Sequence, residues 1–334
     1  MYLLVANPTA QSGKNADRID EARSMMHAHG MRHDFLATQH NGLTVALVAD
    51  ALRTGAYDMV IAMGGDGTFN EVGRGVIESG LQVRMGMVPT GTANDQGRSF
   101  GMNSGRSSLA RNLEILRQGH TTPLDAGRIL AYDTFDNLIG QSWFFDSLGW
   151  GISARILRMR NEDRRMIDGV PFLREVYRDR LVYTGALLRA FMASYVEEQK
   201  FEAEVTTPAG NFVLSGMTDL VIKNTRVYAG AWVFDETALP DDGQMELVPF
   251  RGRHEWLARA VVHLDGLPVV SQLTPSGALS PVTRAPWFDI RIKDRPLGQV
   301  VEAQLDGEES MIAERWRIET VQHALQLCVP AEGS

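Results

Sequence analysis

The sequence predicts an α/β, doubly wound N-terminal domain followed by a β-rich C-terminal domain. The chain has 334 residues, and domains hold about 150 residues each, so two domains are expected. Short apolar runs alternate with amphipathic runs up to about residue 120, which is typical of parallel strands joined by right-handed helical crossovers. Beyond that point, short runs bounded by Gly, Pro and Asp indicate consecutive strands.

The expected elements of the first domain follow from these two patterns. Residues 3–6 are apolar and 57–63 are mostly apolar, and short runs at 32–37 and 83–88 lie between the expected helices, so these four runs predict strands. Between them, apolar residues recur three or four positions apart, as in Phe69, Val72 and Val76. This spacing places them on one helical face. Helices are therefore predicted at 16–28, 43–53, 69–78 and 109–118.

The pattern changes at Thr121-Thr122-Pro123, which places the domain boundary near residue 121 and gives domains of 1–121 and 122–330. In the second domain, turn residues separate alternating runs that we interpret as strands. These are expected at 123–129, 141–146, 201–206, 212–223, 245–250, 287–292, 300–305 and 325–329, with one helical interruption at 172–198.

Composition excludes several classes of protein. The 33 basic and 41 acidic residues give a net charge of −8, which disfavours a nucleic acid as partner. The single cysteine, Cys328, cannot form an internal disulfide, which fits a reducing compartment. The longest nearly uncharged run, 181–196, falls short of the roughly 20 residues of a spanning helix. We therefore expect a water-soluble, cytoplasmic protein.

The most specific motif is Gly64-Gly65-Asp66-Gly67-Thr68-Phe69-Asn70-Glu71, between an expected strand and an expected helix. The carboxyl ends of parallel strands form the ligand edge of a sheet, and glycines let backbone amides approach phosphate oxygens. A plain strand-to-helix turn is the alternative, but one glycine would suffice for it. Three glycines with an acid and a hydroxyl favour phosphate binding.

Two further loops follow expected strands. Pro89 to Asp95 carries hydroxyls, a glycine, an amide and a carboxylate, and it should reach the same crevice as Asp66 because consecutive strands are neighbours. Capping of the next helix is an alternative that is compatible with ligand binding. Asn7 to Lys14 adds hydroxyls and a positive charge without the Walker A spacing; Lys14 fits a ligand contact and a solvated helix start equally well.

Taken together, these three loops resemble the diacylglycerol kinase catalytic family, which also contains sphingosine kinases and bacterial lipid kinases. The resemblance continues through Leu124-Asp125-Ala126-Gly127, Asp241-Asp242-Gly243 and Asp306-Gly307-Glu308, and so covers nearly the whole chain. One departure is Gln96-Gly97, where many relatives carry an aromatic and a small residue. This departure leaves the nucleotide preference open.

The resemblance implies transfer of the γ-phosphoryl group of ATP to a lipid hydroxyl, such as that of diacylglycerol, which would give phosphatidic acid. It implies an NAD-kinase-like N-terminal domain, a C-terminal β-sandwich, and Mg²⁺ beside ATP. The residues implied to contact ATP are Asn7, Pro8, Thr9, Ala10, Gln11, Thr38, Gly64, Gly65, Asp66, Gly67, Thr68, Phe69, Asn70 and Thr92.

By the same resemblance, five acids would line the reaction centre: Asp66, Asp95, Asp125, Asp306 and Glu308. Phosphoryl transfer passes through a transition state of spread charge, so phosphate cradling, Mg²⁺ and one carboxylate near the attacking hydroxyl are what it requires. The proton acceptor is Asp306 or Glu308, and the resemblance favours Glu308. On local sequence alone, an acidic β-turn is an equally good interpretation of this motif.

The segment from Ala238 to Gln244 resembles a structural Mg²⁺ loop of the family. The implied ligands are the Asp242 carboxylate and the main-chain carbonyls of Leu239 and Gln244, and oxygen ligands suit Mg²⁺. Without the resemblance, Asp-Asp-Gly would be interpreted as a hairpin turn, which is compatible with a bound metal.

The lipid side is expected in a basic segment. Residues 155–189 hold nine arginines against five acidic residues, and an apolar run at 181–188 adjoins them. An amphipathic helix of this kind can meet a bilayer with its arginines at the headgroups, which predicts transient contact with a membrane surface. A helix packed on the sandwich with a solvated arginine face is the alternative.

Two other functions stay open. An NAD kinase shares Gly-Gly-Asp-Gly-Thr, although the motifs at 91–95 and 306–308 favour the lipid branch. A catalytically silent nucleotide- or lipid-binding regulator is disfavoured by the retained acids. An exposed sheet edge in the second domain could pair with another copy to give a homodimer, and nothing in the sequence decides this.

Overall fold

A computed structural model describes most of the chain as two compact units. It describes residues 1–8, 14–40, 42–91, 94–154, 200–228, 232–233, 238–252, 255, 261–264, 267–269, 279–293, 301–310 and 312–331. Unit 1 comprises Met1–Gly127, Leu239–Gly243 and Val321–Ser334, and unit 2 comprises Arg128–Ala238 and Gln244–Thr320. The boundary expected at residue 121 lies shortly before the end of the first segment, and the expected division did not include the two later segments of unit 1.

Unit 1 is built on a parallel sheet. Its order is β2 (His33–Ala37), β1 (Tyr2–Ala6), β3 (Met59–Gly64), β4 (Arg84–Pro89) and the end of β20 (Arg315–Cys328). All four neighbouring pairs are parallel. The inner strands β1, β3 and β4 are largely apolar and buried, as a sheet covered on both faces requires. The strand order reverses between β1 and β3, and ligands of such sheets bind beyond the carboxyl ends at that point.

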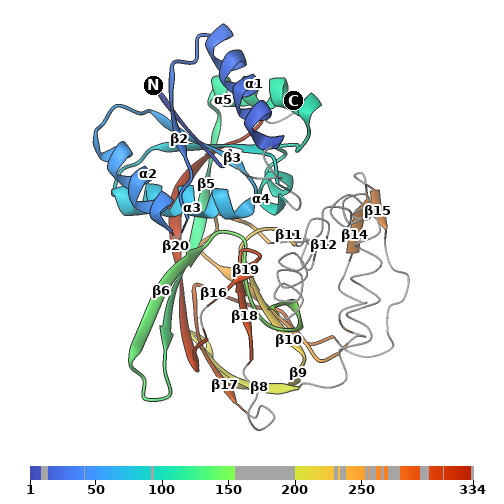
Figure 1. Ribbon diagram of the computed structural model, residues 1–334. Coiled ribbons are helices and arrows are strands. Elements are labelled where there is room, and N and C mark those ends of the chain that lie inside the picture. The colour runs from blue at the N-terminus through green and yellow to red at the C-terminus, as the bar shows by residue number, and fades with distance from the viewer. Residues whose placement is uncertain are drawn as a thin grey trace, which may run out of the picture. The chain divides into compact units, whose positions relative to one another are not determined.

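Helices cover both faces of this sheet, with α1 and α5 on one side and α2 and α3 on the other (Figure 1). Their bounds are α1 Lys14–Ala28, α2 Leu43–Arg53, α3 Asp66–Ser79, α4 Asp95–Ser99, the 3₁₀ turn η2 Arg106–Ser108 and α5 Leu109–Gln118. The predicted α/β fold is confirmed, and α2 and α5 have the predicted ends. The short helix α4 was not predicted, because five residues with a central glycine carry no helical periodicity.

The described residues of unit 2 form two larger antiparallel sheets and one smaller one. One continues from the first half of β20 through β17 (Trp287–Lys293) and β8 (Phe201–Thr207) to β9 (Gly210–Met217), with β5 (Thr121–Tyr132) pairing with β20 and β6 (Leu138–Phe144). The other runs in the order β16 (Thr283–Ala285), β13 (Met245–Phe250), β10 (Asp219–Lys223), β7 (Ser147–Gly151), β18 (Ala303–Leu305) and β19 (Glu308–Glu309). Short strands β11 (Val227–Tyr228), β12 (Trp232–Val233), β14 (Val261–Leu264) and β15 (Leu267–Val269) form a third sheet.

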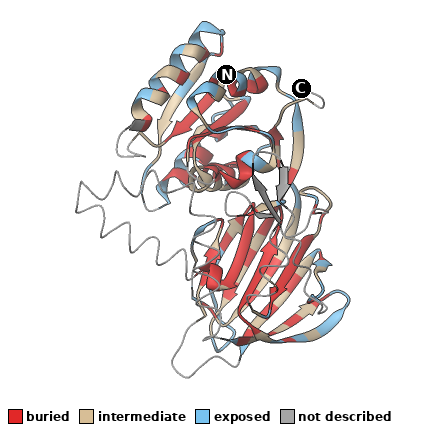
Figure 2. Ribbon diagram, turned by 90° about the vertical axis from the view of Figure 1, so that its right-hand side faces the viewer, coloured by how far each residue is buried: buried red, intermediate tan, exposed pale blue. Residues whose placement is uncertain are grey.

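The core of unit 2 lies between its two larger sheets. Buried side chains from β7, β10 and β13 pack against those from β8, β17 and β20, and Figure 2 shows much of these strands as buried. Trp150 and Trp316 meet edge to face, with ring centroids 5.3 Å apart. Two sheets with one shared apolar core form a β-sandwich, which confirms the predicted fold of the C-terminal domain.

Several elements of unit 2 differ from the sequence prediction. The run 212–223 forms two strands, because the main-chain N–H and hydroxyl of Thr218 both donate to the carbonyl of Phe250, at 2.8 and 3.0 Å, where the chain passes from one sheet to the other. The strand at 325–329 is the end of the much longer β20, and 300–305 contributes only β18. Strands β7 and β19 were not predicted. The expected helix at 172–198 lies outside the described residues.

No helix among the described residues is both long and apolar enough to cross a bilayer.

Candidate active site

The candidate site of unit 1 lies at the carboxyl ends of its parallel strands. The loops after β1, β3 and β4 begin at Asn7, Gly65 and Thr90. Asn7 continues from β1, and its carbonyl accepts a 2.7 Å bond from the Asn15 side chain. Thr38 follows β2 and donates its main-chain N–H to the carbonyl of Ala6 at 2.9 Å. The topology therefore brings these predicted nucleotide contacts to one sheet edge.

Gly64 and Gly65 form the turn from β3 into α3, and only Gly65 lies between the two elements. Gly64 ends the strand and Asp66 begins the helix. A Cβ on Gly64 would lie 2.3 Å from the hydroxyl oxygen of Thr68, so only glycine fits there. The first amides of α3 consequently lie directly at the ligand edge of the sheet, where backbone N–H groups and the helix dipole favour an anion.

The loops after β3 and β4 touch through their backbones. A Cβ on Gly91 would lie 2.5 Å from the Cα of Gly65, and one on Gly65 would lie 3.2 Å from the Cα of Gly91. Asn94 fixes the second loop: its Oδ1 accepts from the Gly91 N–H at 2.9 Å, and its Nδ2 donates to the Gly91 carbonyl at 2.7 Å. Both glycines are therefore required by the contact between the two loops.

This contact brings Asp66 and the start of α4 together. The Asp66 carboxylate accepts a bond from the main-chain N–H of Gln96 at 3.3 Å, and Asp95, the first residue of α4, is buried. The predicted acids Asp66 and Asp95 thus share one edge with Gly64 to Asn70. Lys14 begins α1, but its side chain, like Thr9, Ala10, Gln11 and Thr92, lies outside the described part of the chain.

Asp125 has a different environment from Asp66. It is fully buried on β5, and its two oxygens accept 2.7 Å bonds from the main-chain N–H groups of Gly243 and His323. Its own N–H donates to the carbonyl of Pro240 at 2.7 Å. Burial raises the pKa of Asp125, and the two amide bonds partly oppose this rise. Asp125 therefore joins β5, the turn at 239–243 and β20.

The turn that Asp125 holds contains the predicted Mg²⁺ ligands. Gly243 has a φ of +76°, which suits glycine, and Asp242 is half-buried while Leu239 is exposed. One carboxylate and main-chain carbonyl oxygens are hard donors of the kind Mg²⁺ prefers, so the residues present fit the ion. The described residues contain no cluster of three or more His, Cys, Asp or Glu side chains arranged for a metal. Leu239, Asp242 and Gln244 stay predicted ligands.

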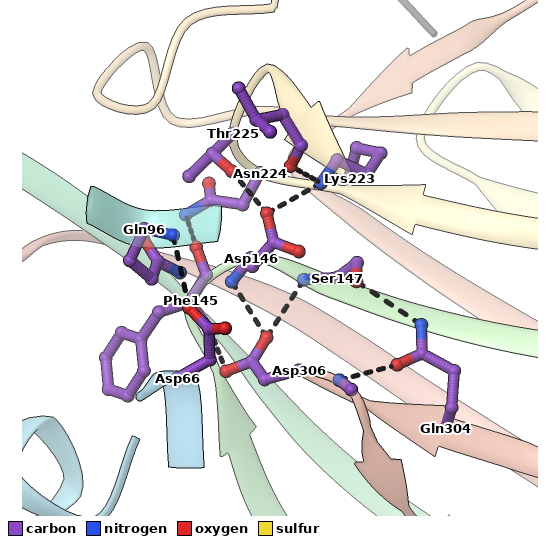
Figure 3. A network of polar contacts seen from close by, with 12 residues as sticks. Asp66, Gln96, Phe145, Asp146, Ser147, Lys223, Asn224, Thr225, Gln304 and Asp306 are labelled. Carbon is purple, nitrogen blue, oxygen red and sulfur yellow. Dashed lines mark hydrogen bonds and ion pairs between the residues drawn. The ribbon is translucent and has the colours of Figure 1, made fainter. Parts of the chain in front are cut away.

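In unit 2, the turn that carries Asp306 and Glu308 gives these two acids opposite environments. The Asp306 carboxylate accepts three main-chain bonds, from Phe145 at 2.9 Å, Asp146 at 2.8 Å and Ser147 at 2.9 Å (Figure 3). Amides that occupy carboxylate lone pairs compete with a proton for them. Glu308, at the start of β19, is exposed. The two acids therefore differ in their contacts, and the choice of Glu308 over Asp306 as proton acceptor stays a prediction.

A buried ion pair supports the segment that Asp306 binds. Lys223 Nζ lies 2.6 Å from Asp146 Oδ1, with 3% and 5% of the two side chains exposed. The Thr225 hydroxyl bonds to the same oxygen, and the Asn224 side chain donates to the Phe145 carbonyl at 2.9 Å (Figure 3). Sequence reasoning missed this network; a possible signal was the lysine that follows the three apolar residues of β10.

Comparisons with known proteins agree with these features. Residues 1–129 match the family model described as "Diacylglycerol kinase catalytic domain". Proteins named diacylglycerol kinase from Staphylococcus aureus (strain bovine RF122 / ET3-1) and Staphylococcus epidermidis (strain ATCC 12228 / FDA PCI 1200) are 30% and 33% identical over 126 and 128 residues. Each match spans 38% of this chain and 39% of the relative, so the chain matches less than half of the length of these relatives.

Solved structures extend the likeness of the fold to the whole chain. A diacylglycerol kinase structure from Bacillus anthracis str. Sterne has a TM-score of 0.67 at 17% identity and covers 98% of this chain and 96% of its own. Yeast NADH kinase in complex with NADH has a TM-score of 0.52 at 8% identity and covers 100% of this chain and 84% of its own. At these identities the likeness shows the fold alone.

Proposed function

Because residues 1–129 match the family model described as "Diacylglycerol kinase catalytic domain", we propose that this chain is an ATP-dependent lipid kinase. It transfers the γ-phosphoryl group of ATP to a lipid hydroxyl, with diacylglycerol as the first acceptor to test. The observation that carries the proposal is the backbone contact between Gly65 and Gly91. This contact joins the glycine-rich turn after β3 to a second polar loop, and it brings Asp66 and Asp95 to one edge.

Each group has a role in this mechanism. The amides that begin α3, released from steric hindrance by Gly64 and Gly65, bind phosphate oxygens of ATP. Glu308 accepts the proton of the lipid hydroxyl as that oxygen attacks the γ-phosphorus, whose bond to the β,γ-bridging oxygen breaks to release ADP. Asp306 holds the turn that carries Glu308. Asp66 and Asp95 are the acids that would hold Mg²⁺ near the phosphates. When bound, Mg²⁺ supplies charge neutralisation of the transferred group.

The direct test incubates the full chain with radiolabelled ATP and Mg²⁺. The acceptors are dioleoylglycerol, sphingosine, ceramide, phosphatidylglycerol and NAD, each offered separately. Label in a lipid supports the proposal and names the acceptor. Label in NAD alone assigns the chain to NAD phosphorylation instead. Absence of transfer to every acceptor contradicts an active kinase and favours a silent binder.

We also propose that the enzyme meets its substrate at a membrane surface, through the basic segment 155–189. This segment lies outside the described residues, so the argument is its sequence: nine arginines next to an apolar run. Co-sedimentation with vesicles of anionic phospholipid is expected, with loss of binding when Arg164, Arg165, Arg174 and Arg178 become glutamine. Unchanged binding of that variant would refute the contact.

A further inference from the structure

The side chain of Gln96 has no hydrogen-bond partner although it is almost completely buried. Only 2% of the residue is exposed, and neither Oε1 nor Nε2 has a partner. A buried amide without partners costs about 1–3 kcal/mol for each group, and buried polar groups are nearly always paired. A methionine of similar length would fill the same space without this cost, so packing alone does not account for a glutamine here.

The main chain around Gln96 leaves this side chain little freedom to leave its position. Its N–H donates to Asp66 Oδ1 at 3.3 Å, as Figure 3 shows, and its carbonyl accepts from the Phe100 N–H at 3.2 Å. The next residue, Gly97, is pressed against Pro89, where a Cβ would lie 2.7 Å from the ring. These contacts fix the main chain of the short helix α4 at this edge of the sheet.

Gln96 also stands beside the acids of the proposed reaction. It follows Asp95 directly in the chain, and its bond to Asp66 places its backbone at the edge formed by the loops after β3 and β4. A substrate group bound at this edge is the partner that we infer for the amide. Such a group satisfies both Nε2, a donor, and Oε1, an acceptor, only if it contains both an acceptor and a donor.

We propose that Gln96 is a specificity residue that binds a hydroxyl or secondary amide of a substrate. An ester or a phosphate offers acceptors only and leaves Oε1 unpaired. A hydroxyl or amide next to the reacting hydroxyl of the acceptor lipid has both capacities, as has a ribose hydroxyl of the nucleotide. The inference rests on the proposed kinase activity and adds to it the chemical group by which a substrate is chosen.

The experiment compares substrates that differ by one hydroxyl. For the lipid, the pair is monooleoylglycerol and trimethylene glycol monooleate, which has CH₂ in place of the middle CHOH. For the nucleotide, the pair is ATP and deoxyATP. The kcat/KM ratio within each pair is measured for the natural chain, for Gln96→Met, and for Gln118→Met, a matched change of an exposed glutamine on α5.

For the natural chain and Gln118→Met, we expect one pair to favour the hydroxyl-bearing member by at least about tenfold, because a site that hydrogen-bonds a hydroxyl discriminates against its absence. Gln96→Met should bring that ratio to within about threefold of unity, through a lower kcat/KM for the hydroxyl-bearing member alone. The pair that responds tells whether the lipid or the nucleotide is bound. A general folding defect would lower both members equally and leave the ratio unchanged.

The inference is overturned if both ratios are the same in the natural chain and in Gln96→Met, since the amide would then be satisfied by bound water. If Gln96→Met does not fold, Gln96→Leu provides the same comparison. Should the natural chain phosphorylate no acceptor at all, the proposed kinase activity fails and this inference fails with it. If the natural chain phosphorylates an acceptor but Gln96→Met leaves both kcat/KM ratios unchanged, the inference about Gln96 fails and the proposed kinase activity stands.

Discussion

Asp306 and Glu308 stand two positions apart in one turn, and their surroundings differ. Three amides bind the Asp306 carboxylate, whereas Glu308 is exposed. The sequence motif alone left both acids as candidates for the proton acceptor. The motif gives no information about the segment Phe145–Ser147, which lies far away in the chain. This segment supplies all three amides that bind Asp306. Local sequence therefore predicts that this turn carries acidic side chains, but it does not predict which of them is held by main-chain amides.

For the reaction, Asp66→Ala and Glu308→Ala are each expected to lower kcat by at least about 10²-fold, the smaller scale of acid–base and electrostatic contributions. The measurement is turnover of radiolabelled ATP with the acceptor found above.

Asp20→Ala and Glu78→Ala serve as matched controls, because both side chains are exposed on helices of unit 1. Near-natural rates in Asp66→Ala and Glu308→Ala would refute the assignment of the acids.

At the scale of elements, the strands β7 and β10 are joined by main-chain pairing and also by a buried ion pair. Asp146, immediately before β7, and Lys223, the last residue of β10, form the buried ion pair, and Thr225 bonds to the same carboxylate. Periodicity predicted the apolar part of β10 correctly because its burial is uniform. It could not predict β7, whose sequence Ser-Leu-Gly-Trp-Gly has two glycines and no regular alternation.

Removal of one partner of this ion pair should be strongly destabilising. Lys223→Met leaves the Asp146 carboxylate buried without its cation, which costs about 3–5 kcal/mol of unfolding free energy. The double variant Asp146→Asn, Lys223→Met removes both charges and should recover a large part of that loss.

Urea denaturation of the three variants and the natural chain measures these differences. An additive loss in the double variant would mean that the two charges do not stabilise each other in the folded protein.

The end of β20 makes stability depend on pH in the alkaline range. Cys328 is fully buried, and burial raises its pKa to about 11 from the ordinary value of 9.0. Folding thus favours the neutral thiol. The stability contributed by this thiol is fully present below pH 9 and is lost as pH rises from about 9 through about 11, by about 3 kcal/mol at most.

The measurement compares urea midpoints at about pH 8, below the ordinary thiol pKa of 9.0, with those at about pH 11, above it. Cys328→Val is the reference, because its side chain cannot ionise. The natural chain should lose more stability than Cys328→Val over this range. An equal loss would show that the thiol does not ionise in the unfolded protein or that it is solvated in the folded one.

At the scale of the whole molecule, unit 1 is assembled from three separate parts of the chain. The sequence predicted its sheet and helices, because these follow from runs of adjacent residues. It did not assign the segments 239–243 and 321–331 to this unit, because their contacts depend on Asp125. The Asp125 carboxylate bonds to Gly243 and His323, and β4 pairs with Gln326 and Leu327 of β20.

This division predicts the behaviour of fragments. Residues 1–127 alone lack the partner of one edge of β4 and leave Asp125 without its two amide donors, so we expect no cooperative thermal unfolding transition. Circular dichroism of this fragment and of the full chain measures the difference.

A peptide of residues 315–331, which carries β20, should restore part of the structure when it is added to the fragment. A cooperative transition in the fragment alone, at the temperature of the full chain, would contradict the dependence on β20.

The discontinuity of unit 1 has a consequence for biosynthesis. The chain passes between the two units four times, at residues 127, 238, 243 and 320, and the part of β20 that completes the parallel sheet is synthesised after every segment of unit 2. The loops after β1, β3 and β4 are made earlier, yet their sheet is completed only by β20. A messenger truncated before the codons for β20 would therefore yield a polypeptide with these loops and an incomplete sheet, which quality-control proteases should remove.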